Sequence, residues 1–178
     1  YQAGDQETRD VLTKLVMSHP QILQLSVETN LQPRLEFFKE QCHLLTSDLA
    51  VLVKKSSASV LALSVKDNLE PTIDFLTDLL RDRPDPASDL RKCLRSHPQL
   101  LALSLKNLHS KKAYFDAIDQ NIHLSCSSSS SLASRVLVRS PAVYSLSLDG
   151  NIVPTIEFMA RVWGTRAPPA RRQDDDIG

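Results

Sequence analysis

The chain has 178 residues, of which 42% are hydrophobic and 24% charged, an ordinary balance for a soluble globular protein. Its 21 basic and 21 acidic side chains cancel, which argues against a nonspecific polyanion binder of the histone type. No apolar run approaches the roughly 20 residues that cross a bilayer, which excludes a spanning segment. Three widely spaced cysteines without a CxxC pair indicate free, mostly buried thiols: Cys42, Cys93 and Cys126.

The first predicted element is an amphipathic helix over residues 6–17, whose aliphatic side chains recur at helical spacing. Pro20 would break this helix but is tolerated in the first turn of a new one. A short helix is therefore expected to begin near Pro20. Its apolar residues, Leu23 among them, leave almost no polar face, so we expect it to be buried between neighbours.

A third helix follows a polar hinge in the segment LQPRLEFFKEQ. Asn30 is expected to cap this helix through its side-chain oxygen, with Pro33 inside the first turn. One unit of about 40 residues thus consists of a leading helix, a short helix and a third helix.

The same pattern occurs four times in the chain. The four windows are SHPQILQLSVETNLQP at 18–33, SSASVLALSVKDNLEP at 56–71, SHPQLLALSLKNL at 96–108 and SPAVYSLSLDGNIVP at 140–154. The first proline slot holds Pro20, Ala58, Pro98 and Pro141, which gives spacings of 38, 40 and 43 residues. Such a period is typical of a solenoid, in which each repeat must stack on its neighbours. The sequence therefore predicts an all-α solenoid of about four repeats, as a single domain over residues 1–164.

The copies share further marks and differ at others. A serine recurs before the hinge, at Ser26, Ser64, Ser104 and Ser147, and an asparagine within it, at Asn30, Asn68, Asn107 and Asn151. Third-helix aromatics recur at Phe37, Phe75, Tyr114 and Phe158, in the apolar positions expected of a core. Copy three has a hinge one residue shorter and Ser110 in place of its second proline, so its third helix is expected to be the least sharply defined. The sequence leaves the burial of Tyr144 and Trp163 open.

Three segments lie outside this pattern. Residues 81–86, RDRPDP, are predicted to form a rigid turn. Residues 125–131, SCSSSSS, are predicted to be a flexible connector whose last serines cap a helix that starts near Leu132. Residues 165–178 combine two prolines, a basic pair and an acidic triplet, and we expect an extended or disordered tail.

Basic side chains recur on the leading helices and are candidate contacts for a nucleic acid. They are Lys14, Lys54, Lys55, Arg91, Lys92, Arg95, Arg135 and Arg139. Stacked repeats would align these helices, and the charges would then merge into a stripe that matches a phosphate backbone. The alternative interpretation is that they are the solvent-exposed faces which any amphipathic helix needs, favoured near helix C-termini by the macrodipole.

No motif for catalysis or for a cofactor occurs in the sequence. With four glycines the chain has no GxSxG elbow, no GxxxxGK[ST] loop and no GxGxxG loop. Its five histidines have no metal-ligand spacing with each other or with the cysteines. The sequence therefore predicts a protein that is not an enzyme, with no catalytic residue, metal or cofactor.

The recurring proline, Leu-Ser pair and Asn-Leu-x-Pro hinge resemble the mTERF family, the mitochondrial transcription termination factors. The resemblance implies an α-solenoid protein of mitochondria or chloroplasts that binds double-stranded DNA or structured RNA along a basic inner stripe. It also implies a role in organelle transcription, RNA maturation or ribosome assembly. The alternative is a scaffold, an accessory subunit of a large organellar complex such as a ribosome or an energy-transducing membrane complex. The zero net charge and the acidic N-terminal half favour that alternative.

Overall fold

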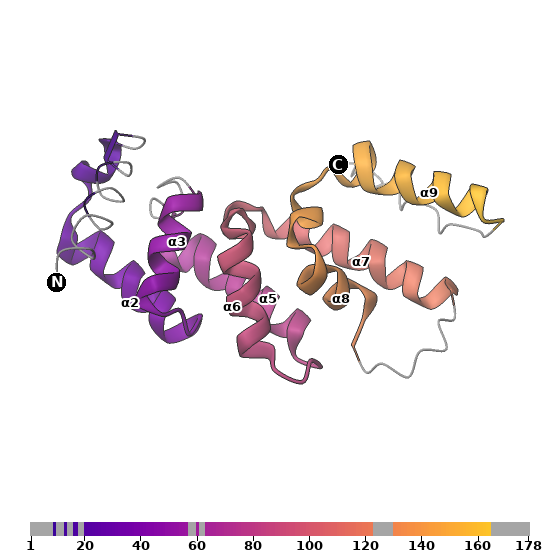
Figure 1. Cartoon of the computed structure of the whole chain (residues 1–178), viewed down its shortest axis with the longest axis horizontal. Helices are drawn as coiled ribbons and strands as arrows, with labels where there is room; N and C mark the ends of the chain where they lie inside the picture. The colour runs from indigo at the N-terminus through magenta and orange to yellow at the C-terminus, as the bar shows by residue number, and fades with distance from the viewer. Residues whose placement is uncertain are drawn as a thin grey trace, which may run out of the picture. The chain divides into compact units, whose positions relative to one another are not determined.

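The computed structural model describes residues 9, 13, 16–17, 20–56, 60, 63–122 and 130–164, and every regular element in them is helical (Figure 1). No strand occurs in the described residues, so the predicted all-α fold class is confirmed. The same residues contain no helix that is both long enough and apolar enough to cross a membrane. The chain divides into two compact units, residues 1–105 and 106–178. A single solenoid domain over 1–164 stays a prediction.

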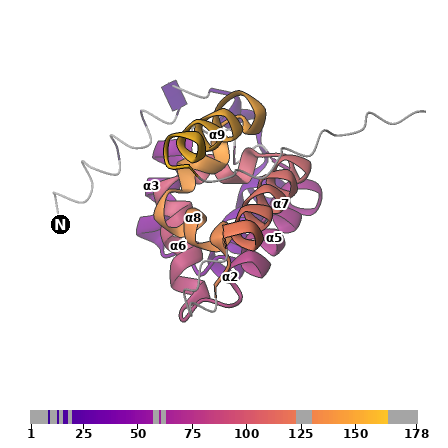
Figure 2. The same cartoon turned by 90° about the vertical axis from the view of Figure 1, so that its right-hand side faces the viewer.

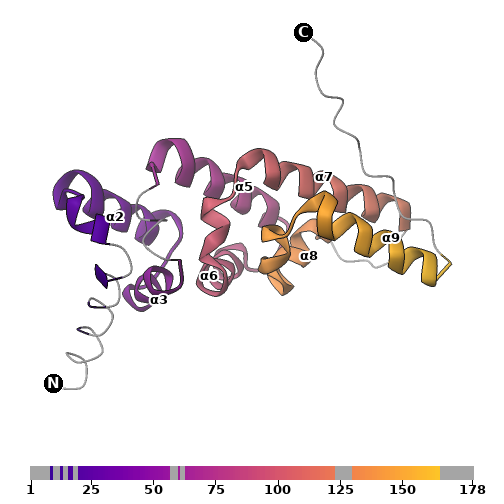
Figure 3. The same ribbon diagram turned by 90° about the horizontal axis from the view of Figure 1, so that it is seen from above.

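Unit 1 holds copies one and two and the first part of copy three. Its elements are η1 (Pro20–Gln24), η2 (Val27–Leu31), α2 (Gln32–Gln41), α3 (Thr46–Ser56), η3 (Val65–Leu69), α5 (Glu70–Leu80), α6 (Pro86–Ser96) and η4 (Pro98–Ala102). Here α2 packs against α3 and α5 packs against α6 (Figure 3). The third helix of each copy in this unit therefore contacts the leading helix of the next copy.

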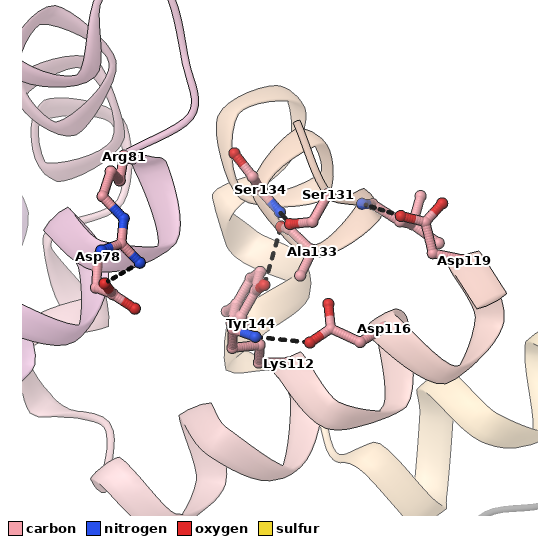
Figure 4. Close-up of polar contacts among 10 residues, drawn as sticks. Asp78, Arg81, Lys112, Asp116, Asp119, Ser131, Ala133, Ser134 and Tyr144 are labelled. Atoms are coloured by element: carbon pink, nitrogen blue, oxygen red, sulfur yellow. Dashed lines mark hydrogen bonds and ion pairs between the residues drawn. The ribbon is translucent and has the colours of Figure 1, made fainter. Parts of the chain in front are cut away.

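Unit 2 holds the third helix of copy three and the whole of copy four. Its elements are α7 (Leu105–Ile122), α8 (Leu132–Arg139), η5 (Pro141–Ser145), η6 (Leu148–Ile152) and α9 (Val153–Val162). α7 and α9 run in the same direction (Figures 1 and 3). Tyr144 is fully buried at the centre, where its hydroxyl donates to the carbonyl of Ala133 at 3.0 Å (Figure 4). Its ring lies 5.9 Å from that of Phe115.

The predicted helix starts are confirmed at the prolines. Pro20, Pro98 and Pro141 each begin a short 3₁₀ turn, namely η1, η4 and η5. The turn before α6 is also present, where the side chain of Asp85 accepts a hydrogen bond from the Ser88 amide. Ser131 caps α8 by accepting from the Ser134 amide at 3.2 Å, as the serine-rich segment predicts (Figure 4).

The hinge is capped by serine and not by asparagine, which corrects our prediction. Ser26, Ser64 and Ser147 each accept a hydrogen bond from the amide three residues later. A single π-helical turn follows in each case, because the next amides bond to carbonyls five residues back. Asn30 instead accepts a hydrogen bond from the Arg34 guanidinium at 3.1 Å.

Copy three has the longest third helix, so the prediction that it would be the least defined is wrong. α7 runs without interruption over Leu105–Ile122. A π turn contains one residue more than the α-helical path, and the hinge of copy three has one residue fewer than the others. Ser110 also keeps the amide that a proline lacks, and its hydroxyl donates to the carbonyl of Lys106. The shorter hinge therefore joins smoothly into an α-helix.

The aromatic core prediction is confirmed for Phe75 and Tyr114, which are buried, while Phe37 is half-buried. It is wrong for Phe158, which is exposed on α9, the last helix described. The expected burial of the first short helix is also wrong at Leu23, which is exposed in the first copy. Both exceptions lie in the outermost described repeats, where burial depends on a neighbouring repeat.

Several predictions fall outside the described residues. They concern Lys14, Cys126, most of the leading helix over 6–17, most of the connector over 125–131 and the tail over 165–178. Both described cysteines, Cys42 and Cys93, are buried thiols, as expected. Burial raises the pKa of the Cys42 thiol to about 12 and that of the Cys93 thiol to about 11, which makes both poor nucleophiles.

Candidate nucleic-acid interface

Two leading helices of unit 1, α3 and α6, pack against each other and bring basic side chains together. The ammonium of Lys55 on α3 donates a hydrogen bond to the carbonyl of Arg95 on α6 at 3.1 Å. The side chain of Gln99 donates in the other direction, to the carbonyl of Lys55 at 3.3 Å. The resulting α3–α6 basic cluster consists of Lys55, Arg91, Lys92 and Arg95. Lys54 also lies on α3, although its side chain is outside the described part.

A buried carboxylate holds this cluster in place. Asp48 on α3 is fully buried and accepts a hydrogen bond from Arg91 Nε at 2.6 Å. The same oxygen also accepts a hydrogen bond from the Leu45 amide. The other carboxylate oxygen lies 3.4 Å from a guanidinium nitrogen of Arg95. Burial raises the pKa of Asp48, but the hydrogen bonds from Arg91 and Leu45 and the attraction of both arginines outweigh burial and lower that pKa.

Lys92 and Arg91 of the cluster differ in how far their side chains are exposed to solvent. The Lys92 side chain is 70% exposed, and its nearest carboxylate, Asp89, lies at 3.8 Å. The Arg91 side chain is only 35% exposed because Asp48 holds it. Four cations thus stand against two carboxylates, Asp48 and Asp89, and Arg83 already pairs with Asp89 at 3.0 Å. The cluster therefore keeps a net positive charge.

The site residues of unit 2 lie on α8. Arg135 lies 3.8 Å from the carboxylate of Asp119, which also accepts a hydrogen bond from the Leu132 amide at 3.0 Å (Figure 4). Arg139 is exposed and has no ion pair with another described residue. The structure therefore brings Lys55, Arg91 and Arg95 together in unit 1, with Lys92 on the same helix α6. It places two candidates on α8 of unit 2, while Lys14 and the side chain of Lys54 are not described.

A comparison with known protein families shows to which family this helical-repeat chain belongs. The mTERF family model matches residues 4–162 of the 178. The chain belongs to the mTERF family. Its fold is accordingly the all-α helical-repeat solenoid of mTERF proteins, as the repeated hinge predicts. No curated protein and no solved structure matches the chain.

Two residues of this mTERF chain that our sequence analysis did not select join successive copies. Arg34 donates to the carbonyl of Leu63 in copy two at 2.9 Å, and Lys111 donates to the carbonyl of Tyr144 in copy four. Each residue directly follows the second proline slot of its copy. A basic residue at this shared position is the feature by which the sequence could have indicated the two contacts. Lys111 is fully buried, and burial lowers its pKa. The two contacts serve packing between repeats and are unavailable to a ligand.

Asp48 is the residue of the candidate interface that sequence reasoning missed. Its partner Arg91 lies 43 positions later, and no local spacing connects the two. A signal does exist in the segment LTSDL, because an acidic residue in the first turn can accept a hydrogen bond from the amide that precedes the helix. In the described part of this mTERF chain, no three His, Cys, Asp or Glu side chains lie together as metal ligands would.

Proposed function

We propose that this mTERF protein binds nucleic acid through the α3–α6 basic cluster, as a binding protein and not an enzyme, in the gene expression of a mitochondrion or chloroplast. The observation that supports the proposal best is the packing of α3 on α6. This packing places the basic side chains of two repeats side by side, linked by the contact from Lys55 to Arg95. Adjacent cations on neighbouring repeats suit a ligand whose negative charges also repeat.

The geometry of the arginines supports a contact with phosphate. Arginine carries five N–H donors, and Asp48 accepts a hydrogen bond from only Nε of Arg91. The remaining donors stay free to approach a second anion, while the buried carboxylate limits the motion of the guanidinium. Such contacts position a backbone without reading its sequence, so both double-stranded DNA and structured RNA are candidate ligands.

The test is a binding titration with the exposed lysines neutralised. Lys55→Gln with Lys92→Gln removes two charges and leaves Arg91 on its buried partner. We expect the double variant to bind a DNA duplex and an RNA hairpin more weakly, with a salt dependence reduced by about one to two charges. Fluorescence anisotropy at several salt concentrations measures both quantities, and the two ligands separate DNA from RNA.

The matched control is Lys39→Gln with Lys66→Gln, which removes two exposed lysines of the same unit from α2 and η3. This pair should leave the affinity nearly unchanged. The proposal is wrong if the wild-type chain retains neither ligand at low salt. It is also wrong if the control pair weakens binding as much as the cluster pair does.

A further inference from the structure

Two arginines of α6, Arg91 and Arg95, both approach the buried Asp48 on α3, but the carboxylate holds them differently. Nε of Arg91 donates a hydrogen bond to one carboxylate oxygen at 2.6 Å. Nη1 of Arg95 lies 3.4 Å from the other oxygen, which has no hydrogen-bond partner among the described residues. The guanidinium of Arg95 is therefore attracted to Asp48 without being held by a hydrogen bond.

The charges and exposures of the two arginines differ in the same sense. Asp48 carries one negative charge, and the hydrogen-bonded guanidinium of Arg91 already neutralises it. The Arg91 side chain is 35% exposed, whereas the Arg95 side chain is 57% exposed. An incoming phosphate thus meets more of Arg95, and drawing Arg95 away from Asp48 breaks no hydrogen bond between the two.

The end of α6 does not need the side chain of Arg95. A basic residue in the last turn can serve its own helix by approaching the last carbonyls. At this helix end, however, the Cys93 carbonyl accepts from the His97 amide at 2.8 Å and from the Ser96 hydroxyl at 3.0 Å. The carbonyl of Arg95 accepts from the Lys55 ammonium. The carbonyls therefore have other donors than the Arg95 guanidinium.

The contact from Lys55 also fixes the main chain of Arg95. It joins α3 and α6, which lie on the same side of unit 1, opposite α5 (Figures 2 and 3). Arg95 thus combines a main chain that the preceding repeat holds with a guanidinium that is hydrogen-bonded to no described residue. This combination suits a ligand contact, because little main-chain freedom is left to lose on binding.

The two guanidinium groups also differ in the edge that they can offer to a ligand. Asp48 attracts Nη1 of Arg95, which leaves Nε and Nη2 on the other edge. Two such neighbouring nitrogens can donate to two oxygens of one phosphate. In Arg91 the Nε of this edge is already bound to Asp48.

We propose that Arg95 makes the principal phosphate contact of the α3–α6 basic cluster, with Nε and Nη2 donating to two oxygens of one backbone phosphate. The principal role of Arg91 is to join the two repeats through Asp48. This assignment rests on the proposed function, because it names the residue through which the cluster binds nucleic acid.

The test compares Arg95→Gln with Arg91→Gln in the full chain. Fluorescence anisotropy with the DNA duplex and the RNA hairpin is measured at several salt concentrations, below the melting temperatures of both variants. We expect Arg95→Gln to weaken binding about tenfold and to lower the slope of log affinity against log salt by about one. Its melting temperature should stay close to that of the wild type.

Arg91→Gln should show the opposite division of effects. It removes the hydrogen-bonded partner of a buried carboxylate, so we expect a lower melting temperature. Its affinity for either nucleic acid should fall less than that of Arg95→Gln.

Two further variants separate geometry from charge. Arg95→Lys keeps the charge but has no paired donors, so it should keep the salt slope and recover only part of the affinity. Arg81→Gln is the matched control, because it removes an arginine of the same unit that is 73% exposed and directly follows α5. This control should leave the affinity nearly unchanged.

The outcomes separate this assignment from the proposed function. If the lysine double variant weakens binding and Arg95→Gln does not, the cluster binds nucleic acid but Arg95 is not its principal contact. The assignment is also wrong if Arg91→Gln, still folded, loses at least as much affinity as Arg95→Gln. Full affinity of Arg95→Lys would contradict the two-point contact. A wild-type chain that retains neither ligand at low salt would contradict the proposed function and this assignment together.

Discussion

At the scale of single residues, the two buried tyrosines of unit 2 differ in the surroundings of their hydroxyls. The Tyr144 hydroxyl donates to the carbonyl of Ala133, whereas the buried Tyr114 hydroxyl has no hydrogen-bond partner among the described residues. A buried hydroxyl that makes a hydrogen bond stabilises the folded state. A buried hydroxyl without one lowers the free energy of unfolding, because it has lost its contacts with water and gained no hydrogen bond. The two side chains therefore form a matched pair.

Tyr144→Phe is expected to lower the free energy of unfolding by about 1 kcal/mol, because it removes a buried hydrogen bond. Tyr114→Phe is expected to leave that free energy unchanged or to raise it by up to about 1 kcal/mol. Urea denaturation followed by circular dichroism measures both. Equal destabilisation by the two substitutions would contradict the hydrogen-bond assignment.

Asp48 provides a prediction about pH. Because its pKa is lowered in the folded chain, its stabilising contribution is present above the unfolded value of about 4 and is lost as the pH falls through the folded value. Asp48→Asn should cost about 1 kcal/mol near neutral pH, a low figure because solvent reaches both arginines. The difference from the wild type should shrink below about pH 4.

Asp74→Asn is the control for this experiment, since Asp74 is exposed on α5. It should have little effect at any pH. Chemical denaturation between acid and neutral pH gives both curves. A difference between the wild type and Asp48→Asn that stays constant down to the lowest pH would show that the carboxylate charge does not stabilise the contact between α3 and α6.

At the scale of elements, the serine-capped π turn is the structural feature that copies one, two and four share. The cap distance from amide to hydroxyl is 3.3 Å at Thr29 and Asp67 but 3.0 Å at Gly150. A Cβ at Gly150 would lie 3.1 Å from the Ser147 hydroxyl. Copies one and two accommodate a full side chain at this position with the longer cap distance.

Gly150→Ala is therefore expected to stabilise the chain by about 0.5 to 1 kcal/mol, because alanine loses less backbone entropy on folding. The melting temperature measures the effect. Gly164→Ala is the contrasting control and should destabilise, since its φ of +69° is unfavourable for a residue with a Cβ. A lower melting temperature for Gly150→Ala would mean that the turn cannot relax as copies one and two do.

The helix starts at the prolines could be predicted because they depend on local chemistry. A ring that removes the N–H and fixes φ acts within one turn of its own position. The choice between serine and asparagine as the cap could not be predicted in this way, because both side chains recur and both can accept a hydrogen bond. The shorter hinge of copy three was visible in the sequence. Its consequence, an uninterrupted α7, could not be predicted without knowing that the longer hinges of the other copies form π turns.

At the scale of the whole molecule, repetition explains both the successes and the failures of the core prediction. The aromatic of the third helix occupies one position in every copy, yet it is buried at Phe75 and exposed at Phe158. Periodicity reports which side of a helix is apolar. It does not report whether a neighbour is present, because in a solenoid the core lies between repeats.

For the basic residues too, the sequence pattern predicts where they lie on the helices but not which other repeat they contact. Their place on leading helices follows from the amphipathic pattern, and Lys92 is exposed as such a pattern requires. Pattern alone could not reveal that Arg91 is engaged by a buried carboxylate from another repeat. Charge reversal at Arg91 would therefore disturb the fold as well as a ligand, which is why neutralised lysines are the better test.

The sequence by itself determined the helical class, the repeat, the helix starts and the family, because proline chemistry and apolar periodicity act over a few residues. Only the tertiary structure decided which charges are held and which are free, and which apolar faces are covered. These properties depend on residues such as Asp48 and Arg91, 43 positions apart, that meet only when one repeat packs on the next.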